Sequence, residues 1–435
     1  MSAPLPRLAR APNWFEGCLF LLLLSGPPKF RNRDPLASLD GTIDLVVAFH
    51  LVVWACGGLW VLARLYPALL RRGTMPPVNG AQGLGALFIL AMTLSLWHSP
   101  GILLTAFSLG QLAVMLCFVW VYTHRFGTAV CLRHLFIGVT VLAVATLALV
   151  FLAPALVITD FGTLGGVTRI RGDLIADTGS VAVIGLVLCL SSMPPLRGPV
   201  FWGALSLFGI VLAASRTRSA YVAFVVFLGM GFVYGKGLRV RQLVLPLALA
   251  ALSVFFMDAF SAATSYLLRE RESVQNMSDR IPLWQHLTSV VMRDSPITGL
   301  GYAAASRVAS TEYNPALGNA HSAFFEVLVG GGIIGAALYL VLCASLVWFA
   351  IRLSRVGRGQ PRAVSVLGLL STALLMGFTS SAAVQPGPLG FAFWSLTALL
   401  PGLSSEAAHG RIAGNRRLLT RRSTLRADRV VVSPS

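Results

Sequence analysis

A few arginines and one histidine are the residues of this sequence best suited to chemistry. Arg216 and Arg218 lie in the turn SRTRSA, which joins two apolar runs and holds no acidic residue. An arginine near membrane depth is energetically expensive and usually faces a cavity or an anion. Since the guanidinium fork binds phosphate oxygens in a bidentate manner, the pair is suited to a diphosphate. The alternative is that both side chains extend to lipid head groups.

Other arginines stand in neighbouring polar segments. Arg169 and Arg171 belong to the segment TRIRGDLIAD, and Arg280 begins the stretch RIPLWQHLTSVVMRD. The topology derived below places these segments on the outer side of a membrane, where arginine is normally depleted. Their presence there favours an anionic ligand at the level of the lipid head groups, such as a lipid-linked diphosphate.

His321 stands at the start of a long apolar run. A neutral imidazole, whose ordinary pKa is about 6.5, can accept the proton of a sugar hydroxyl that attacks an anomeric carbon. A departing diphosphate is stabilised by arginines and needs no protonation, so one base and a cationic clamp would suffice. The alternative is that His321 only caps a helix.

Three nearby residues have two interpretations each. Glu326 falls one helical turn after Ser322, where it could orient an arginine or pair for stability. Trp284 and Tyr302 could stack on sugar rings or be ordinary interfacial aromatics. The glycines of GGIIG are more typical of close helix packing than of chemistry.

The sequence holds no Walker loop, dinucleotide-binding glycine pattern or metal-ligand spacing, so we expect no cofactor and no metal.

The elements that position these residues are membrane helices. Hydrophobic residues make up 56% of the 435 positions and charged residues 11%, and apolar stretches of about 17 to 25 residues recur along the chain. This composition predicts an all-α polytopic membrane protein with about twelve transmembrane helices. We expect them near residues 12–28, 43–65, 82–98, 101–123, 131–156, 177–194, 199–215, 219–235, 242–265, 321–351, 363–382 and 390–405.

The positions of the basic segments predict which side of the membrane each loop faces. The tail from Arg411 to Arg429 carries seven arginines and one aspartate, and the loop from Arg352 to Arg362 carries four arginines and no acid. Both are therefore expected in the cytoplasm, which accounts for the net charge of +18 without nucleic acid as a partner. The longest loop, roughly 264–320, then lies outside and contains an amphipathic helix in SDRIPLWQHLTSVVMRD, with Arg280 in its first turn. The basic segment KFRNRDP disagrees, because it also falls outside.

Four motifs in a fixed order resemble the O-antigen ligase family, which includes O-antigen and exopolysaccharide polymerases. They are the Ser-Arg turn at Arg216, DRIPLW with Arg280, the turn SPITGLGY, and AHSAFFEVLVGGGIIG with His321. The resemblance covers about 207–340. It departs from the family pattern at Ser322, where asparagine is usual, and the segment 168–185 looks like a degenerate form of the family's Arg-Gly segment.

The resemblance implies a metal-independent membrane glycosyltransferase with a fold like that of the C type, in a bacterial inner membrane with its active site facing the periplasm. It would move a glycan from undecaprenyl diphosphate to an acceptor hydroxyl. Arg216 and Arg280, assisted by Arg218 and Arg171, would hold the diphosphate, and His321 would act at the acceptor. The acceptor is either the lipid A core, for a ligase, or another glycan, for a polymerase. A transporter of lipid-linked sugar or another anion is the alternative from a different class, although no internal repeat is found.

This interpretation divides the chain into four parts. Residues 1–198 form the N-terminal transmembrane helices, and 199–352 form the core with its periplasmic loop 265–320. Residues 353–405 form the C-terminal transmembrane helices, and 406–435 a basic cytoplasmic tail.

Overall fold

The computed structural model describes residues 11–26, 44–70, 77–154, 158–161, 167–170, 177–191, 193, 195–234, 280–314, 318–356 and 360–404. The first half of this chain contains α1 (Trp14–Ser25), α2 (Leu45–Leu70), α3 (Gly80–Met92), the 3₁₀ helix η2 (Thr93–His98), α4 (Ile102–Phe126), α5 (Thr128–Leu152), and the strands β1 (Ile158–Phe161) and β2 (Val167–Ile170). The second half contains α7 (Thr178–Leu190), α8 (Gly198–Ser215), α9 (Arg218–Tyr234), α12 (Arg280–Asp294), α13 (Ala304–Tyr313), α14 (Ala323–Val356), α15 (Pro361–Thr379), the 3₁₀ helix η4 (Ser381–Ala383) and the helix Pro388–Ser404.

The described chain is helical apart from one antiparallel strand pair, β1 with β2. Seven of its helices are long and apolar enough to cross a membrane, and four further apolar helices are shorter. This confirms a polytopic α-helical membrane protein. Every predicted helix is present except that at 242–265, which lies outside the described residues, as do the segment KFRNRDP and the basic tail. The strand pair and α13 were not predicted.

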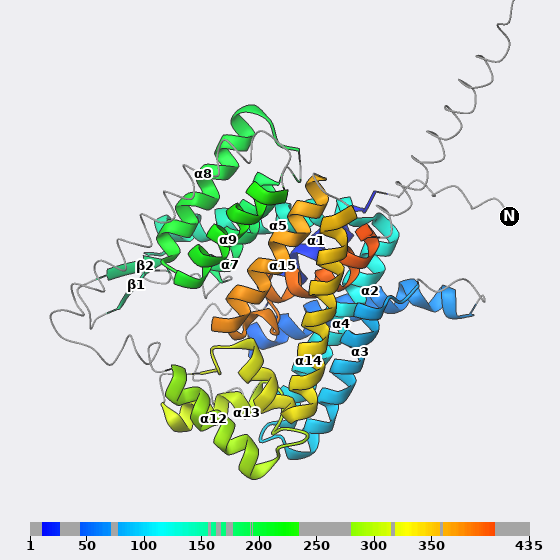
Figure 1. Cartoon of the computed structure of the whole chain (residues 1–435), viewed down its shortest axis with the longest axis vertical. Helices are drawn as coiled ribbons and strands as arrows, with labels where there is room; N and C mark the ends of the chain where they lie inside the picture. The colour runs from blue at the N-terminus through cyan, green and yellow to red at the C-terminus, as the bar shows by residue number, and fades with distance from the viewer. Residues whose placement is uncertain are drawn as a thin grey trace, which may run out of the picture.

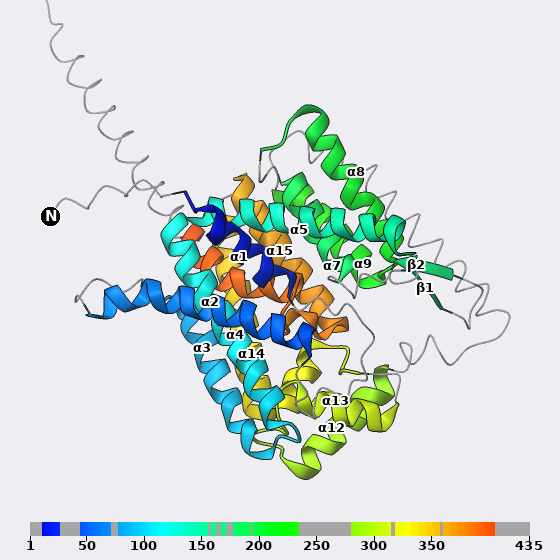
Figure 2. The same ribbon diagram turned by 180° about the vertical axis from the view of Figure 1, so that it is seen from behind.

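The helices pack into one bundle with a smaller group at one end. α7 packs against α5, α8 and α9, α15 packs against α9 and α14, and α14 packs against α3. Both views place α12 and α13 at one end of this bundle (Figures 1 and 2). There α12 and α13 contact each other and α14, and they share a small apolar core of their own.

The amphipathic pattern predicted within 278–294 is confirmed by α12. Its buried side chains are Leu283, Trp284, Leu287 and Val291, which follow one face of the helix. Their partners in the small core come from α13, α14 and the residues before α14. The apolar stripe is thus covered by protein, and α12 is held in a fixed place.

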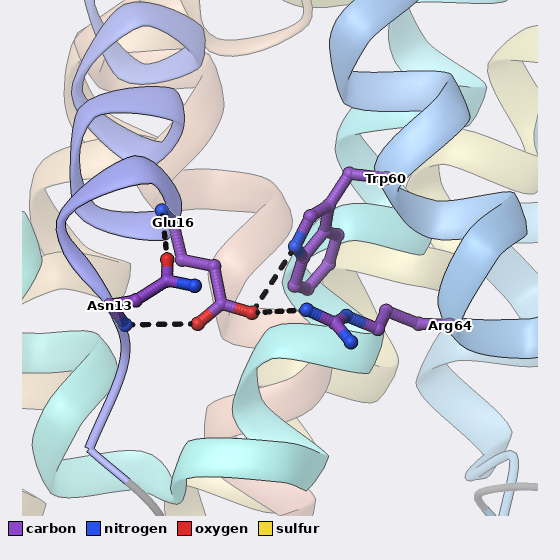
Figure 3. A network of polar contacts seen from close by, with 4 residues as sticks. All are labelled: Asn13, Glu16, Trp60 and Arg64. Atoms are coloured by element: carbon purple, nitrogen blue, oxygen red, sulfur yellow. Dashed lines mark hydrogen bonds and ion pairs between the residues drawn. The ribbon is translucent and has the colours of Figure 1, made fainter.

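A polar network joins the first two helices (Figure 3). Asn13 and Glu16 form a capping box that begins α1. The buried Glu16 carboxylate also accepts hydrogen bonds from Trp60 Nε1 at 3.3 Å and from Arg64 Nη2 at 2.9 Å, both on α2. One carboxylate therefore begins α1 and fixes it against the C-terminal half of α2.

Replacing Glu16 with alanine should lower the free energy of unfolding by about 2 kcal/mol, because Arg64 and Trp60 lose their shared acceptor and the N–H of Asn13 loses the Glu16 half of the capping box. Thermal unfolding of the detergent-solubilised protein measures this as a lower melting temperature. Glu16→Gln keeps an acceptor for Trp60 and should lose less. Equal melting temperatures for wild type and Glu16→Ala would contradict the network's role.

A break in α14 receives a loop that precedes it. Gly332 has φ 60° and ψ −157°, which interrupts the helix. The loop 295–302 enters this break: the carbonyls of Pro296 and Ile297 accept from the N–H groups of Ile333 and Ile334 at 2.9 and 3.2 Å. The N–H of Leu300 donates in turn to the carbonyl of Val329 at 2.9 Å. The loop thus supplies the backbone partners that the broken helix lacks.

Glycine is required where the two backbones meet. A Cβ on Gly299 would overlap the backbone of Gly332, and a Cβ on Gly332 would overlap that of Ile297. On the same stretch of helix, a Cβ on Gly331 would overlap the side chain of Met92 on α3. This confirms that the GGIIG glycines serve close packing.

Replacing Gly332 with alanine should destabilise the protein by about 1–3 kcal/mol or more, since the backbone angles there are nearly exclusive to glycine. The melting temperature and the yield of folded protein measure the effect. Gly203→Ala is the matched control, because Gly203 lies on α8 with open space around it. A Gly332→Ala variant as stable as Gly203→Ala would show that the break is not needed.

Candidate active site

The turn between α8 and α9 carries two arginines in a fixed conformation. α8 ends at Ser215, Arg216 adopts the left-handed conformation with φ 47° and ψ 31°, and α9 begins at Arg218. The turn lies against the first turn of α7, where a Cβ on Gly179 would come within 2.8 Å of the Thr217 side chain. Arg216 and Arg218 are both exposed. The packed backbone therefore presents two guanidinium groups at the surface.

Arg280 joins this group from a distant part of the sequence. It is the first residue of α12 and is half-buried. Burial, and next the nearby positive charge of Arg218, lower the pKa of the Arg280 guanidinium below its ordinary value. Among the described residues no carboxylate forms an ion pair with Arg218 or Arg280. Two like charges held together in this way would be stabilised by a bound anion.

His321 belongs to a short strap, residues 318–322, that leads into α14. Its backbone is left-handed, with φ 51°, and its N–H donates to Asn319 Oδ1 at 2.8 Å. The side chain is half-buried. In the described chain the non-glycine residues with positive φ are Arg216, Ala303 and His321. Such strained positions are concentrated at functional sites, and two of these three are residues that the sequence had singled out.

Glu326 supports the strap from the first turns of α14. Its carboxylate is fully buried and accepts from Ser306 Oγ at 2.6 Å and from the N–H of Ala320 at 3.4 Å. A hydrogen bond from the Gln385 side chain and the charge of Arg307 also act on it. The carboxylate therefore connects α13, the strap and the segment after η4.

Trp284 and Tyr302 lie inside the protein. The Tyr302 hydroxyl donates to the carbonyl of Val384, and its side chain is fully buried. The Trp284 indole N–H donates to the carbonyl of Ala320 at 2.9 Å, and its ring stacks on Phe325 with centroids 4.8 Å apart. These contacts favour supporting roles for both aromatics over contact with a sugar.

The contacts link most of the predicted residues into one region. Arg218 and Arg280 lie near each other, and one turn along α12 Trp284 bonds to the residue before His321. Arg169 lies on β2, where its backbone pairs with Thr159, and β2 contacts α8. Arg171 lies outside the described residues.

Two supporting residues were missed from the sequence. Ser306 lies on α13, which is ten residues long and has few large apolar side chains to reveal it. Asn319 is visible as a polar residue before His321, but its hydrogen bond depends on the left-handed backbone that only the structure shows.

An open groove of about 450 Å³ runs along α12. It begins one residue after Arg280 and extends along the helix for about three turns. Apolar side chains line most of it, with three uncharged polar ones between them. The lining residues are Ile281, Trp284, Gln285, Thr288, Ser289, Met292 and Phe325. An amphiphile with its anionic group at Arg280 would find an apolar path beside it.

Comparison with known families agrees with this arrangement. Residues 203–340 match the family model described as O-antigen ligase. The match spans 138 of the 435 residues of the chain. No protein in a comparison with curated proteins matches the chain. The family predicted from the motifs is therefore confirmed by the family model.

The matched stretch contains most of the residues described above. It covers most of α8, then α9, α12, α13 and the first half of α14. Arg218, Arg280, His321 and Glu326 all fall within it, and so do the loop 295–302 and the break in α14. In the part of the chain that the structure describes, no group of three or more His, Cys, Asp or Glu residues could hold a metal ion.

Proposed function

We propose that this protein is a membrane-embedded glycosyltransferase that moves a glycan from undecaprenyl diphosphate to an acceptor hydroxyl on the periplasmic side of a bacterial inner membrane. The proposal is supported by Arg280, whose pKa is lowered by the charge of Arg218, on the helix that bonds to the strap of His321, within the stretch that matches the O-antigen ligase family. A site with a cationic pair and one imidazole suits a reaction whose leaving group is a diphosphate.

The arginines bind and stabilise the donor. Arg280 and Arg218 hold the diphosphate oxygens, and Arg216, exposed in the same turn, is available as a third cation. The groove along α12 accommodates the first part of the polyprenyl chain, because it starts beside Arg280 and is mostly apolar. As the bond between the anomeric carbon and the diphosphate breaks, the new negative charge forms where the guanidinium groups already lie.

His321 acts on the acceptor. Its neutral imidazole takes the proton of the acceptor hydroxyl while the oxygen of that hydroxyl bonds to the anomeric carbon. The products are the glycosylated acceptor, undecaprenyl diphosphate and a protonated imidazole, which returns its proton to water. We propose the lipid A core as the acceptor, as for an O-antigen ligase. Another carrier-linked glycan is the acceptor in the alternative, a polymerase of the same family.

The test is transfer by the purified protein in proteoliposomes with an undecaprenyl-diphosphate glycan. Core lipid and a second carrier-linked glycan are offered separately, each with and without a chelator. We expect product with the core lipid and no loss of rate with the chelator. Product with the carrier-linked glycan alone would make the protein a polymerase. Donor movement across the bilayer without any product would replace the transferase by a transporter.

A further inference from the structure

We propose that Trp284 is a positioning residue that fixes His321 relative to Arg280 through its hydrogen bond to Ala320. This inference rests on the proposed function, because it gives Trp284 a task in the reaction assigned to that site. If the contacts of the strap position His321, their loss should lower turnover and leave donor binding unchanged.

The strap 318–322 is held by hydrogen bonds at three backbone groups next to the His321 side chain. The N–H of Ala320 donates to the buried Glu326 carboxylate at 3.4 Å, and the N–H of His321 donates to Asn319 Oδ1 at 2.8 Å. The carbonyl of Ala320 accepts from Trp284 Nε1 at 2.9 Å. A left-handed backbone at a bulky residue persists only where the surroundings hold it, so these bonds maintain the conformation of His321.

Among these three contacts, only that of Trp284 comes from the helix of the diphosphate clamp. Glu326 and Asn319 belong to α14 and to the strap itself, whereas Trp284 lies on α12. Arg280 and Trp284 are four residues apart, so their side chains leave the same face of that helix. The indole N–H is therefore the direct link between the arginine that would hold the leaving group and the base that would activate the acceptor.

The indole is itself fixed on several sides. Its side chain is 7% exposed. One ring face stacks on Phe325, with an angle of 14° between the planes, and Phe378 of α15 meets the ring at 72° with centroids 5.9 Å apart. Phe325 follows His321 by four residues on the start of α14. A ring clamped in this way can transmit a precise position from α12 to the strap.

Trp284→Phe removes the N–H donor and keeps an aromatic ring to stack on Phe325. We expect kcat to fall by about 10- to 100-fold, because a displacement of about 1 Å between reacting groups costs a factor of that size. The KM for the donor should stay within about twofold, because Arg218 and Arg280 are unchanged and phenylalanine keeps an apolar ring in the lining of the groove. Initial rates at varied donor concentration in proteoliposomes give both constants.

Trp60→Phe is the matched control. Trp60 is likewise buried and likewise donates its indole N–H to a partner, here Glu16, but it belongs to the α1–α2 network and not to the strap (Figure 3). The control should keep wild-type kcat. Melting temperatures of both variants show whether each is folded before the rates are compared.

Asn319→Ala tests the same strap at a half-buried residue whose side chain accepts a hydrogen bond from the N–H of His321. It should also lower kcat with an unchanged donor KM. In the double variant Trp284→Phe/His321→Ala, turnover should be no lower than in His321→Ala alone, because Trp284 acts through His321. If Trp284 served only stability, Trp284→Phe would lower turnover further in the His321→Ala background.

Wild-type kcat in a folded Trp284→Phe, or in Asn319→Ala where Trp284→Phe does not fold, would overturn the inference. A raised donor KM with normal kcat would overturn it as well, because Trp284 would then serve the donor. These results leave the proposed function intact as long as wild type transfers glycan and His321→Ala does not. If wild type makes no product with either acceptor, the proposed function itself fails.

Discussion

Replacing His321 with alanine should lower the turnover number for glycan transfer by about 10²- to 10⁴-fold, the range that a positioned general base contributes. The KM for the donor should change little, because in the proposed mechanism the diphosphate is bound by arginines on α9 and α12 and not by the imidazole. Initial rates with saturating acceptor and varied donor measure both constants. His321→Gln, which can hydrogen-bond but cannot serve as the base, should be about as slow as His321→Ala.

His134 provides the control for this result. It is a half-buried histidine that contacts Tyr122 and the carbonyl of Val130 within the bundle, and none of its recorded contacts involves the strap or α12. His134→Ala should keep wild-type turnover once its folding is verified. Undiminished turnover in a folded His321→Ala would remove the base from the mechanism.

Replacing Arg280 with alanine should lower kcat/KM for the donor by about 10²- to 10³-fold, the loss typical of removing one preorganised group that stabilises transition-state charge. Arg280→Lys should recover only part of the loss, because lysine keeps the charge but lacks the planar fork that binds two phosphate oxygens. The measurement is the initial rate at donor concentrations well below KM.

Arg293→Ala is the matched control, since Arg293 lies at the other end of α12. Its side chain is 73% exposed and paired with Asp294. This variant should transfer glycan at the wild-type rate. In the double variant Arg218→Ala/Arg280→Ala, the loss of kcat/KM should differ from the sum, in free energy, of the losses in the two single variants. The reason is that the two guanidinium groups act on the same anion. Equal rates for Arg280→Ala and Arg293→Ala would contradict the clamp.

The membrane helices could be predicted because a long apolar stretch has few stable alternatives in a membrane. The helix predicted at 199–215 is found at Gly198–Ser215, and that predicted at 101–123 is found at Ile102–Phe126. The break in α14 could not be predicted. The glycines were visible, but their neighbour, the loop 295–302, is brought to them only by the tertiary fold.

The arginine and histidine of the candidate site could be predicted from their residue types. The hydrogen bonds that hold them in place could not. Arg280 and His321 stand out because charge is expensive beside apolar runs. The bond from Trp284 to Ala320 depends on the packing of α12 against α14, and the bond from Ser306 to Glu326 depends on the placement of α13. The sequence left two roles open for each of Trp284 and Glu326. These contacts favour a supporting role for both, in which they hold the strap.

We propose that a single site of this protein joins a diphosphate-linked donor to an acceptor hydroxyl. The most direct test is to measure, in the same reaction of the purified protein, the undecaprenyl diphosphate released and the glycosylated acceptor formed. We predict equal amounts of the two products from wild type and the loss of both in Arg280→Ala and His321→Ala. Undecaprenyl diphosphate released without glycosylated acceptor, or neither product formed while the donor crosses the bilayer, would contradict the claim.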